Sequence, residues 1–208
     1  MYKKQILSLV CFTIVFLSVS ALLPASQAEV PEAELPVLLT SCGQSPGANM
    51  LKAIFMRLKL QHEPKAYQLV PIATPADLKA ALDSGAPYKT MIVVMGASLK
   101  GMGAAGISMD DELARTTQLI EAARSQGITI IGSHIEGMKR RSQGADPGDN
   151  TDELSIDAVA PNSDFLIIRK DGNEDGRFSA IAQEKNIPLV EVEKNMELFE
   201  VLKQVFTR

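Results

Sequence analysis

Six short, mostly apolar runs alternate along the chain with segments of helical period. The runs cover residues 35–39, 67–70, 90–95, 128–131, 165–168 and 188–192. Their apolar residues are largely continuous and do not alternate with polar ones, which is typical of strands covered on both faces of a sheet. The pattern therefore predicts six buried strands separated by helices.

The helical segments are recognised by apolar stripes and by their start signals. Three stripes have helical spacing: Met50, Leu51, Ile54, Phe55 and Leu58; Leu113, Ile120 and Ala123; and Leu198, Leu202, Val205 and Phe206. Thr74 with Asp77, and Ser108 with Asp111, each place an oxygen cap three residues before a carboxylate. Together these signals predict an α/β fold, a three-layer Rossmann-like single domain over residues 36–208 with a mostly parallel six-stranded sheet.

The strand order decides which loops meet. A flavodoxin-like order, 2-1-3-4-5-6, brings the loops after the first and third strands together at the switch point, and we favour it. The alternative order, 3-2-1-4-5-6, pairs the first loop with His134. Because ligands of such sheets bind outside the carboxyl ends of the strands, we expect function in the loops at residues 41–47, 96–107, 133–150 and 170–176.

The N-terminus has the features of an export signal. Lys3 and Lys4 precede an apolar run at residues 6–23, and small residues before position 29 suit a signal peptidase. We predict a signal peptide at residues 1–28, a short spacer at 29–35 and a periplasmic or extracellular mature protein. The alternative is an uncleaved membrane anchor, since the run is long enough. A lipobox ending at Cys42 is disfavoured because the acidic spacer separates it from the apolar run.

Charge and cysteine content narrow the functional classes. Removing residues 1–28, which contain two lysines and no acidic residue, changes the formal net charge from −4 to −6. An acidic protein is a poor partner for nucleic acid or for an anionic membrane, so we expect neither, and no stable membrane insertion after cleavage. Cys11 would leave with the signal, which makes Cys42 a lone thiol, interpreted as a small buried residue.

Residues 43–47 read Gly-Gln-Ser-Pro-Gly and fit the nucleophile elbow of serine hydrolases. That elbow needs the backbone N–H of the residue after the serine, and Pro46 has none. We therefore interpret Ser45 as a helix cap and Pro46 as the first helical residue.

Residues 101–106 match the dinucleotide fingerprint G-x-G-x-x-G. The strand before them ends near Met95 and the expected helix cap, Ser108, follows the motif, so the fingerprint is in the wrong place for a nucleotide. No cofactor is expected.

Two further patterns suggest metal or acid–base chemistry. Asp171, Asn173 and Asp175 copy the first half of a calcium-binding loop, but Ala182 stands where a bidentate glutamate belongs. We favour no metal there and expect Asn173 or Asp175 to cap the next helix. His134 and Glu136 could form an acid–base pair, although a polar strand end is the simpler interpretation.

The remaining chemistry at the carboxyl edge favours an anion. Two loops rich in glycine and hydroxyl groups lead toward helix starts, where backbone N–H groups attract negative charge. Cationic side chains follow them at Lys100 and at residues 139–141. The predicted ligand-binding set is Gln44, Ser45, Ser98, Lys100, Gly101, Gly103, His134, Arg140 and Arg141.

The chain also resembles a family of exported bacterial α/β proteins classed as a domain of unknown function. The resemblance rests on L-L-T-S-x-G-Q-S, G-A-S-x-K-G-x-G-A-A-G-I and I-G-x-H-I-E-G-x-x-R-R, and it covers residues 36–206. It implies the fold and an exported location, and no activity.

Three functions follow as hypotheses. The first is a non-enzymatic binder of a small anionic ligand at the carboxyl edge of the sheet. The second is a hydrolase or transferase with His134 as general base and Glu136 as its orienting partner. The third is an envelope protein-interaction module, whose partner and oligomeric state the sequence does not specify.

Overall fold

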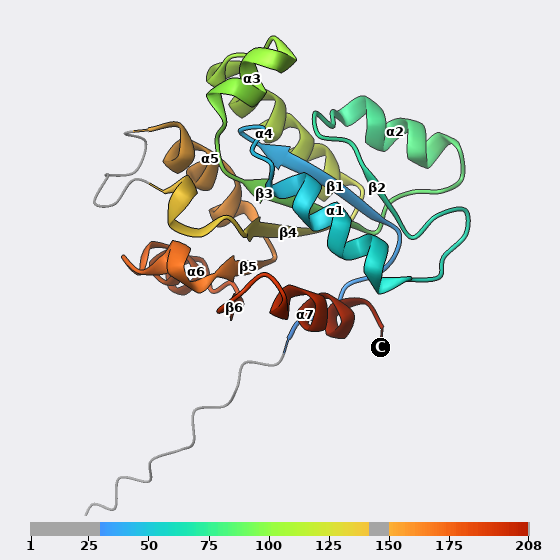
Figure 1. Ribbon diagram of the computed structural model, residues 1–208. Coiled ribbons are helices and arrows are strands. Elements are labelled where there is room, and N and C mark those ends of the chain that lie inside the picture. Colours follow the sequence, from blue (N-terminus) through green and yellow to red (C-terminus); the bar gives the residue numbers. More distant parts are fainter. Residues whose placement is uncertain (1–29, 142–149, 208) are drawn as a thin grey trace, which may run out of the picture.

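The computed structural model describes residues 30–141 and 150–207, and its centre is a six-stranded, all-parallel sheet. The strands are β1 (Val37–Cys42), β2 (Tyr67–Leu69), β3 (Thr90–Met95), β4 (Thr129–His134), β5 (Phe165–Arg169) and β6 (Leu189–Val192). Their order is β2-β1-β3-β4-β5-β6, which confirms the flavodoxin-like prediction (Figure 1).

The strands match the apolar runs, with differences at their ends. Every residue of β1 and β3 is buried. β1 begins at Val37 because Pro36 has no N–H for the ladder, and it continues through Thr40 and Ser41, which the run at residues 35–39 excluded. β4 likewise extends to His134, which pairs with Ile168. Polar residues therefore continue into strand ends at the edge where function is expected.

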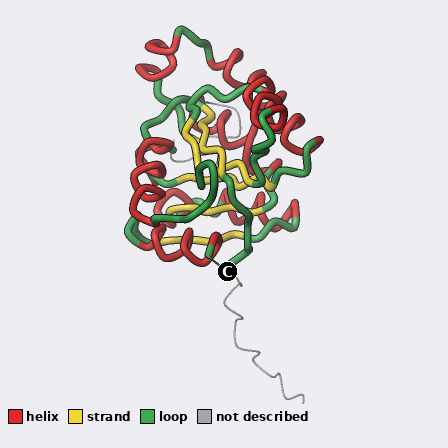
Figure 2. Tube along the Cα trace, turned by 90° about the vertical axis from the view of Figure 1, so that its right-hand side faces the viewer, coloured by secondary structure: helices red, strands yellow, loops and turns green. Residues whose placement is uncertain are grey.

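Helices cover both faces of the sheet and complete three layers (Figures 1 and 2). One face packs against α1 (Gly47–Leu58) and α7 (Glu197–Phe206), where Phe55 and Phe206 stack at 5.6 Å between ring centroids. Four helices pack on the other face: α2 (Pro75–Asp83), α4 (Met109–Ser125), α5 (Thr151–Val159) and α6 (Arg177–Lys185). The three-layer prediction is therefore confirmed.

Shorter helices lie in the loops at the carboxyl edge. They are α3 (Leu99–Ala105) and the 3₁₀ turns η1 (Gly137–Arg140), η2 (Ala160–Asn162) and η3 (Lys170–Asn173). α3 projects from the sheet in Figure 1. It contains most of the G-x-G-x-x-G pattern, so the interpretation of residues 96–107 as a loop was incomplete.

The capping predictions have mixed outcomes. Thr74 and Ser108 form the expected capping boxes. α1 begins at Gly47 rather than at Pro46, and the Ser45 hydroxyl accepts a hydrogen bond from Gly47 N at 3.4 Å, as expected of a capping serine. A carboxylate from another loop, described below, accepts from the same N–H at a slightly shorter distance.

The N-terminal spacer is part of the packed structure from Val30 onward. Val30 and Leu35 pack against the α1–α7 side of the core, and Ala33 N donates to Val205 O at 3.0 Å. The predicted signal peptide lies outside the described residues, as do residues 142–149 of the fourth-strand loop. Among helices in the described ranges, none has both the length and the apolar character needed to cross a bilayer.

Candidate functional site

The loops after β1 and β3 meet at the carboxyl edge, as the strand order requires. Gln44 forms an isolated antiparallel bridge with Ala97, and Ser98 N donates to Gly43 O at 2.7 Å. Contact is so close that a Cβ on Gly43 would lie 2.5 Å from Gly96 O, and one on Gly101 would lie 2.3 Å from Gln44 O. Glycine at 43 and 101 is therefore needed to bring the two loops together.

Three backbone N–H groups of this loop pair donate to carboxylates of the chain itself. The donors and acceptors are Gly43 N with Glu112 Oε1 at 2.9 Å, Gly47 N with Glu136 Oε2 at 3.2 Å, and Ala97 N with Asp152 Oδ1 at 2.7 Å. Amides turned toward an anion are what glycine-rich loops and helix starts provide. The amides of Gly43, Gly47 and Ala97 are therefore occupied by carboxylates of the protein itself.

Two of these carboxylates, Glu112 and Glu136, also pair with an arginine. Arg115 donates to Glu112 at 2.8 Å and also to the backbone oxygens of Ala73 and Ser41. Burial raises the pKa of Asp152 above its ordinary value. The Ala97 N–H and the charge of Arg140 both lower this pKa, but burial outweighs them. The loop amides are therefore anchored to α4, η1 and α5, which fixes the shape of the edge.

The cationic residues of the predicted set fall into two environments. Arg140 donates to Ala97 O at 2.8 Å and to Glu136 at 3.3 Å, while 28% of its side chain stays exposed. Lys100 and Lys139 are exposed and have no partner among the described residues. These three side chains are the positive groups that face solvent near the two loops.

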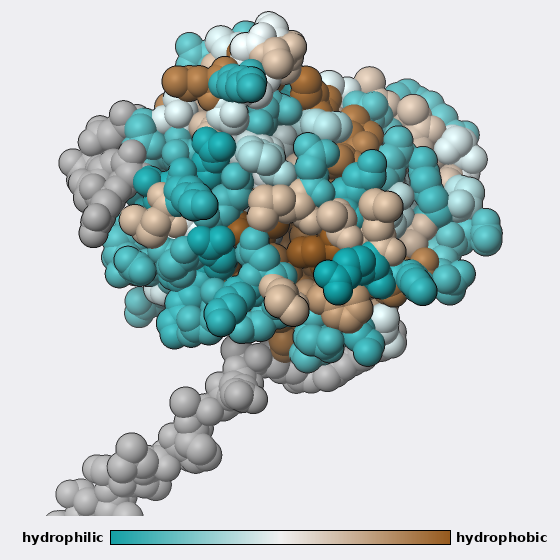
Figure 3. Space-filling model, in the orientation of Figure 1, coloured by the Kyte–Doolittle hydropathy of each residue, from teal (hydrophilic) through white to brown (hydrophobic). Residues whose placement is uncertain are grey.

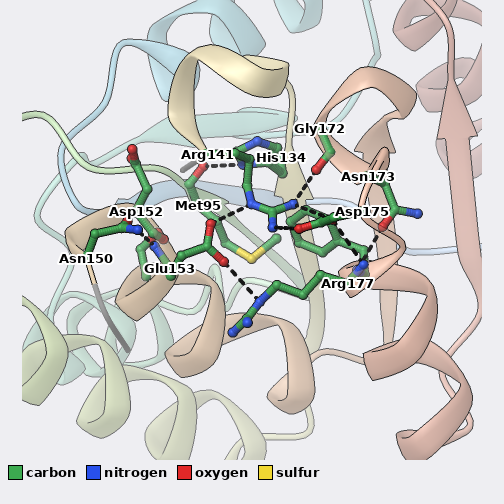
Figure 4. Close-up of polar contacts among 12 residues, drawn as sticks. Met95, His134, Arg141, Asn150, Asp152, Glu153, Gly172, Asn173, Asp175 and Arg177 are labelled. Atoms are coloured by element: carbon green, nitrogen blue, oxygen red, sulfur yellow. Dashed lines mark hydrogen bonds and ion pairs between the residues drawn. The ribbon is translucent and has the colours of Figure 1, made fainter. Parts of the chain in front are cut away.

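Arg141 is in the other environment, because its side chain is only 1% exposed. Its guanidinium donates to Glu153 Oε1 at 2.6 Å, to Gly172 O at 2.5 Å and to both oxygens of Asp175 (Figure 4). The other oxygen of Glu153, Oε2, lies 3.0 Å from Arg177 Nε. These two atoms form an ion pair, but they are not aligned for a hydrogen bond. Arg141 therefore ties η1 to α5 and η3, with its charge already matched by the chain.

His134 is completely buried beside this cluster (Figure 4). Its Nδ1 is 3.1 Å from Met95 O and its Nε2 is 3.2 Å from Gly137 O. Burial lowers the pKa of the imidazole below its ordinary value, although the two carbonyls favour the protonated ring. Both nitrogens thus contact backbone oxygens, and neither contacts a serine hydroxyl of residues 30–141 or 150–207.

Ser98, Gly101 and Gly103 belong to α3 rather than to an open loop. Ser98 caps the helix by accepting a hydrogen bond from Gly101 N at 3.0 Å, and Gly103 lies in the helix interior. The amides of both glycines are consequently used within the helix. The Ser98 hydroxyl keeps its own O–H available as a donor.

In the loop that resembles a calcium site, the oxygens face protein donors. Asp171 binds Arg169 and Asp175 binds Arg141, while Asn173 Oδ1 accepts from Phe178 N at 2.8 Å. Asp175 also accepts from the first amide of α6, so both expected caps are found. Within the described ranges, no three His, Cys, Asp or Glu residues group in a way that could hold a metal ion.

Sequence reasoning missed the residues that organise the edge, namely Glu112, Asp152 and Glu153. Glu112 and Glu153 are fully buried carboxylates in the first turns of α4 and α5. Acidic residues in a first helical turn are ordinary on a surface. Only the fold reveals that these point inward, so no signal in one sequence distinguishes them.

The fold and this edge define an α/β protein with a flavodoxin-like sheet and a carboxyl edge held together by internal ion pairs. The chain belongs to the family described as a domain of unknown function, DUF6305, which it matches over residues 34–206. Comparison with curated proteins gave no match.

Two solved structures are distantly similar. The RcsB response regulator of Salmonella typhimurium is 14% identical, with a TM-score of 0.32, covering 81% of this chain and 67% of that chain. A proposed acylhydrolase from Bacteroides fragilis is 13% identical, with a TM-score of 0.35, covering 86% of this chain and 88% of that chain. Likenesses this distant carry no argument about what this chain does.

Proposed function

We propose that the protein is an exported, non-enzymatic binder of a small anionic ligand at the carboxyl edge of its sheet. The observation that carries the proposal is the set of solvent-facing cations beside the two loops, Lys100, Lys139 and the exposed part of Arg140. They lie on a rim whose backbone amides already bind carboxylates. In an acidic protein, such a cluster is the most favourable place for an anion to bind.

Arg140 supports the proposal through the way its guanidinium is held. Its bonds to Ala97 O and Glu136 use Nη1 and Nε, and Nη2 has no partner among the described residues. A fixed guanidinium with one free edge is a good binder of carboxylate or phosphate oxygens. Lys100 and the Ser98 hydroxyl, one turn away on α3, would add charge and a hydrogen bond. Gln44 and Ser45 would then shape the floor of the site.

The alternative of a hydrolase or transferase has less support. A general base must reach the proton that it removes, and His134 is buried with both nitrogens on backbone oxygens. Glu136 accepts from Gly47 N and from Arg140, and does not contact either ring nitrogen of His134. The geometry therefore favours binding over acid–base catalysis.

Thermal unfolding with added ligands tests the proposal. Succinate and inorganic phosphate, at constant ionic strength, should raise the melting temperature of the wild type. Lys100→Ala should lose most of that rise, while the matched control Lys79→Ala should keep it, because Lys79 lies on α2 and pairs with Asp83. Equal stabilisation of both variants would remove Lys100 from the site.

An interaction module is a second candidate, and one feature favours it. A hollow of about 540 Å³ lies between α1 and α7, lined by Met50, Ile54, Met196 and Phe199 among others. Met196 is 81% exposed. Figure 3 shows brown, apolar side chains in a hollow near the centre of this face. Exposed methionines suit a protein contact. If this hollow binds a protein, the wild type should capture a partner in a pull-down and Met196→Lys should not, while anion binding at the carboxyl edge stays the same in both.

The export step is tested by the mass of the mature protein. If residues 1–28 are a cleaved signal, protein recovered from outside the cytoplasm should begin at Glu29. A mass that retains Met1, with the protein in the membrane fraction, would instead identify an uncleaved anchor.

A further inference from the structure

A second cavity lies between α2 and the strand β2. Its volume is about 310 Å³, and its lining residues come from β2 and the residues on either side of it, from α2 and the turn after it, and from the residues just before β1 and β3. α2 flanks the edge strand β2 in Figure 1. The apolar part of the wall consists of Pro36, Pro64, Val70, Ala80, Ala81 and Ala86.

Three polar side chains form one end of this cavity. The Tyr88 hydroxyl donates to Gln68 Oε1 at 2.6 Å, and the Lys65 ammonium donates to the same oxygen. Burial, and then the charge of Asp77, raise the pKa of the Tyr88 phenol above its ordinary value, so the hydroxyl stays protonated. Because two donors fix the amide oxygen, Gln68 Nε2 is left as an oriented donor without a partner among the described residues.

A carboxylate supplies the opposite charge. Asp77 uses Oδ2 to accept from both the N–H and the hydroxyl of Thr74, at 2.8 Å each. Its other oxygen has no hydrogen bond within the described ranges, and Asp77 lines the cavity. The cavity therefore combines one cation, one anion, an amide donor and an apolar wall.

We propose that this cavity binds a small zwitterion with an apolar body, in the class of free α-amino acids of about the size of leucine. The ligand carboxylate would bind Lys65 and Gln68 Nε2, and its ammonium would bind the free oxygen of Asp77. An anion without a positive group would be repelled by the carboxylate of Asp77, and a cation without a negative group would be repelled by the ammonium of Lys65. The volume is at the lower end of the range for ligand sites, which suits a molecule this small. This site is independent of the anion site proposed at the carboxyl edge.

Calorimetric titration with L-leucine tests the site directly. We expect a dissociation constant on the order of 1 mM or tighter for a ligand of this size. 4-Methylpentanoate is leucine without the ammonium and 3-methylbutylamine is leucine without the carboxylate, so each should bind at least about tenfold more weakly, the value of one charged hydrogen bond.

Two lysine variants provide the matched comparison. Lys65→Met should weaken leucine binding by about tenfold or more, whereas Lys79→Met, on α2 and paired with Asp83 outside the cavity, should leave it unchanged. Both lysines are exposed, so both variants should fold. Three results would each overturn the proposal: no leucine binding at about 10 mM, tenfold above the expected dissociation constant; binding of 4-methylpentanoate as tight as that of leucine; or an unchanged affinity in the Lys65→Met variant.

Discussion

Gly101 and Gly103 lie two residues apart in α3, yet replacing each with alanine should change the free energy of unfolding in opposite directions. Alanine favours a helix over glycine by about 1 kcal/mol, so propensity alone would stabilise both variants. A Cβ at Gly103 meets nothing within 4 Å, whereas a Cβ at Gly101 would lie 2.3 Å from Gln44 O. That oxygen belongs to the backbone and cannot rotate away.

The magnitudes follow from these two terms. Forcing extra volume into a packed contact costs about 1–3 kcal/mol, and a 2.3 Å approach to a backbone oxygen belongs in the upper part of that range, at about 2–3 kcal/mol. After the gain in propensity of about 1 kcal/mol, Gly101→Ala should therefore lose about 1–2 kcal/mol. Gly103→Ala should gain about 0.5–1 kcal/mol. Urea unfolding followed by circular dichroism measures both, and the wild type is the reference. A Gly101→Ala protein as stable as the Gly103→Ala protein would refute the close contact between the first and third loops.

Three other predictions concern the interior. Arg141→Met should lower the free energy of unfolding by about 3–5 kcal/mol in urea, because it leaves the buried carboxylate of Glu153 with Arg177 alone; a loss below about 1 kcal/mol would contradict this account. Burial alone would raise the pKa of Asp175, but hydrogen bonds from Arg141 and from Arg177 N outweigh it and hold the pKa below its ordinary value. The Asp175 carboxylate therefore stabilises the folded protein above about pH 4, and this stabilisation is lost as the pH falls through the pKa of Asp175 in the folded state. Asp175→Asn should reduce the acid sensitivity of urea unfolding. An unchanged pH profile of the free energy of unfolding would count against the ion pair between Asp175 and Arg141. Burial raises the pKa of Cys42 to about 12, so iodoacetamide at pH 8 should leave Cys42 unmodified in the folded protein and label it only after unfolding.

The sheet could be predicted from the sequence because its strands are buried on both faces. A short, continuous run of apolar residues, as in β3, is typical of a strand that is covered on both faces of a sheet. The strand order was favoured rather than determined, since glycine-rich loops after β1 and β3 suggested neighbouring strands while the order 3-2-1-4-5-6 stayed open. What favoured the order was the expectation of a shared site, and the bridge between Gln44 and Ala97 agrees with it.

The occupants of the loop amides could not be predicted. Glu112 and Asp152 are separated from their amide donors by more than fifty residues, and nothing local marks them as buried partners. α3 was missed for a different reason: its glycines have low helix propensity, so the segment was interpreted as a loop although Ser98 could cap a helix. Arg140 and Arg141 are adjacent and identical in type, and only the packing of η1 makes one solvent-facing and the other internal.

The most direct test of anion binding at the carboxyl edge is a ¹H–¹⁵N NMR titration with succinate at constant ionic strength. Saturable shifts confined to the backbone amides of Ser98 and Lys100 and to the Nε–Hε group of Arg140 are the predicted result. Absence of shifts at these three groups, or small changes spread evenly over the surface, would contradict the account.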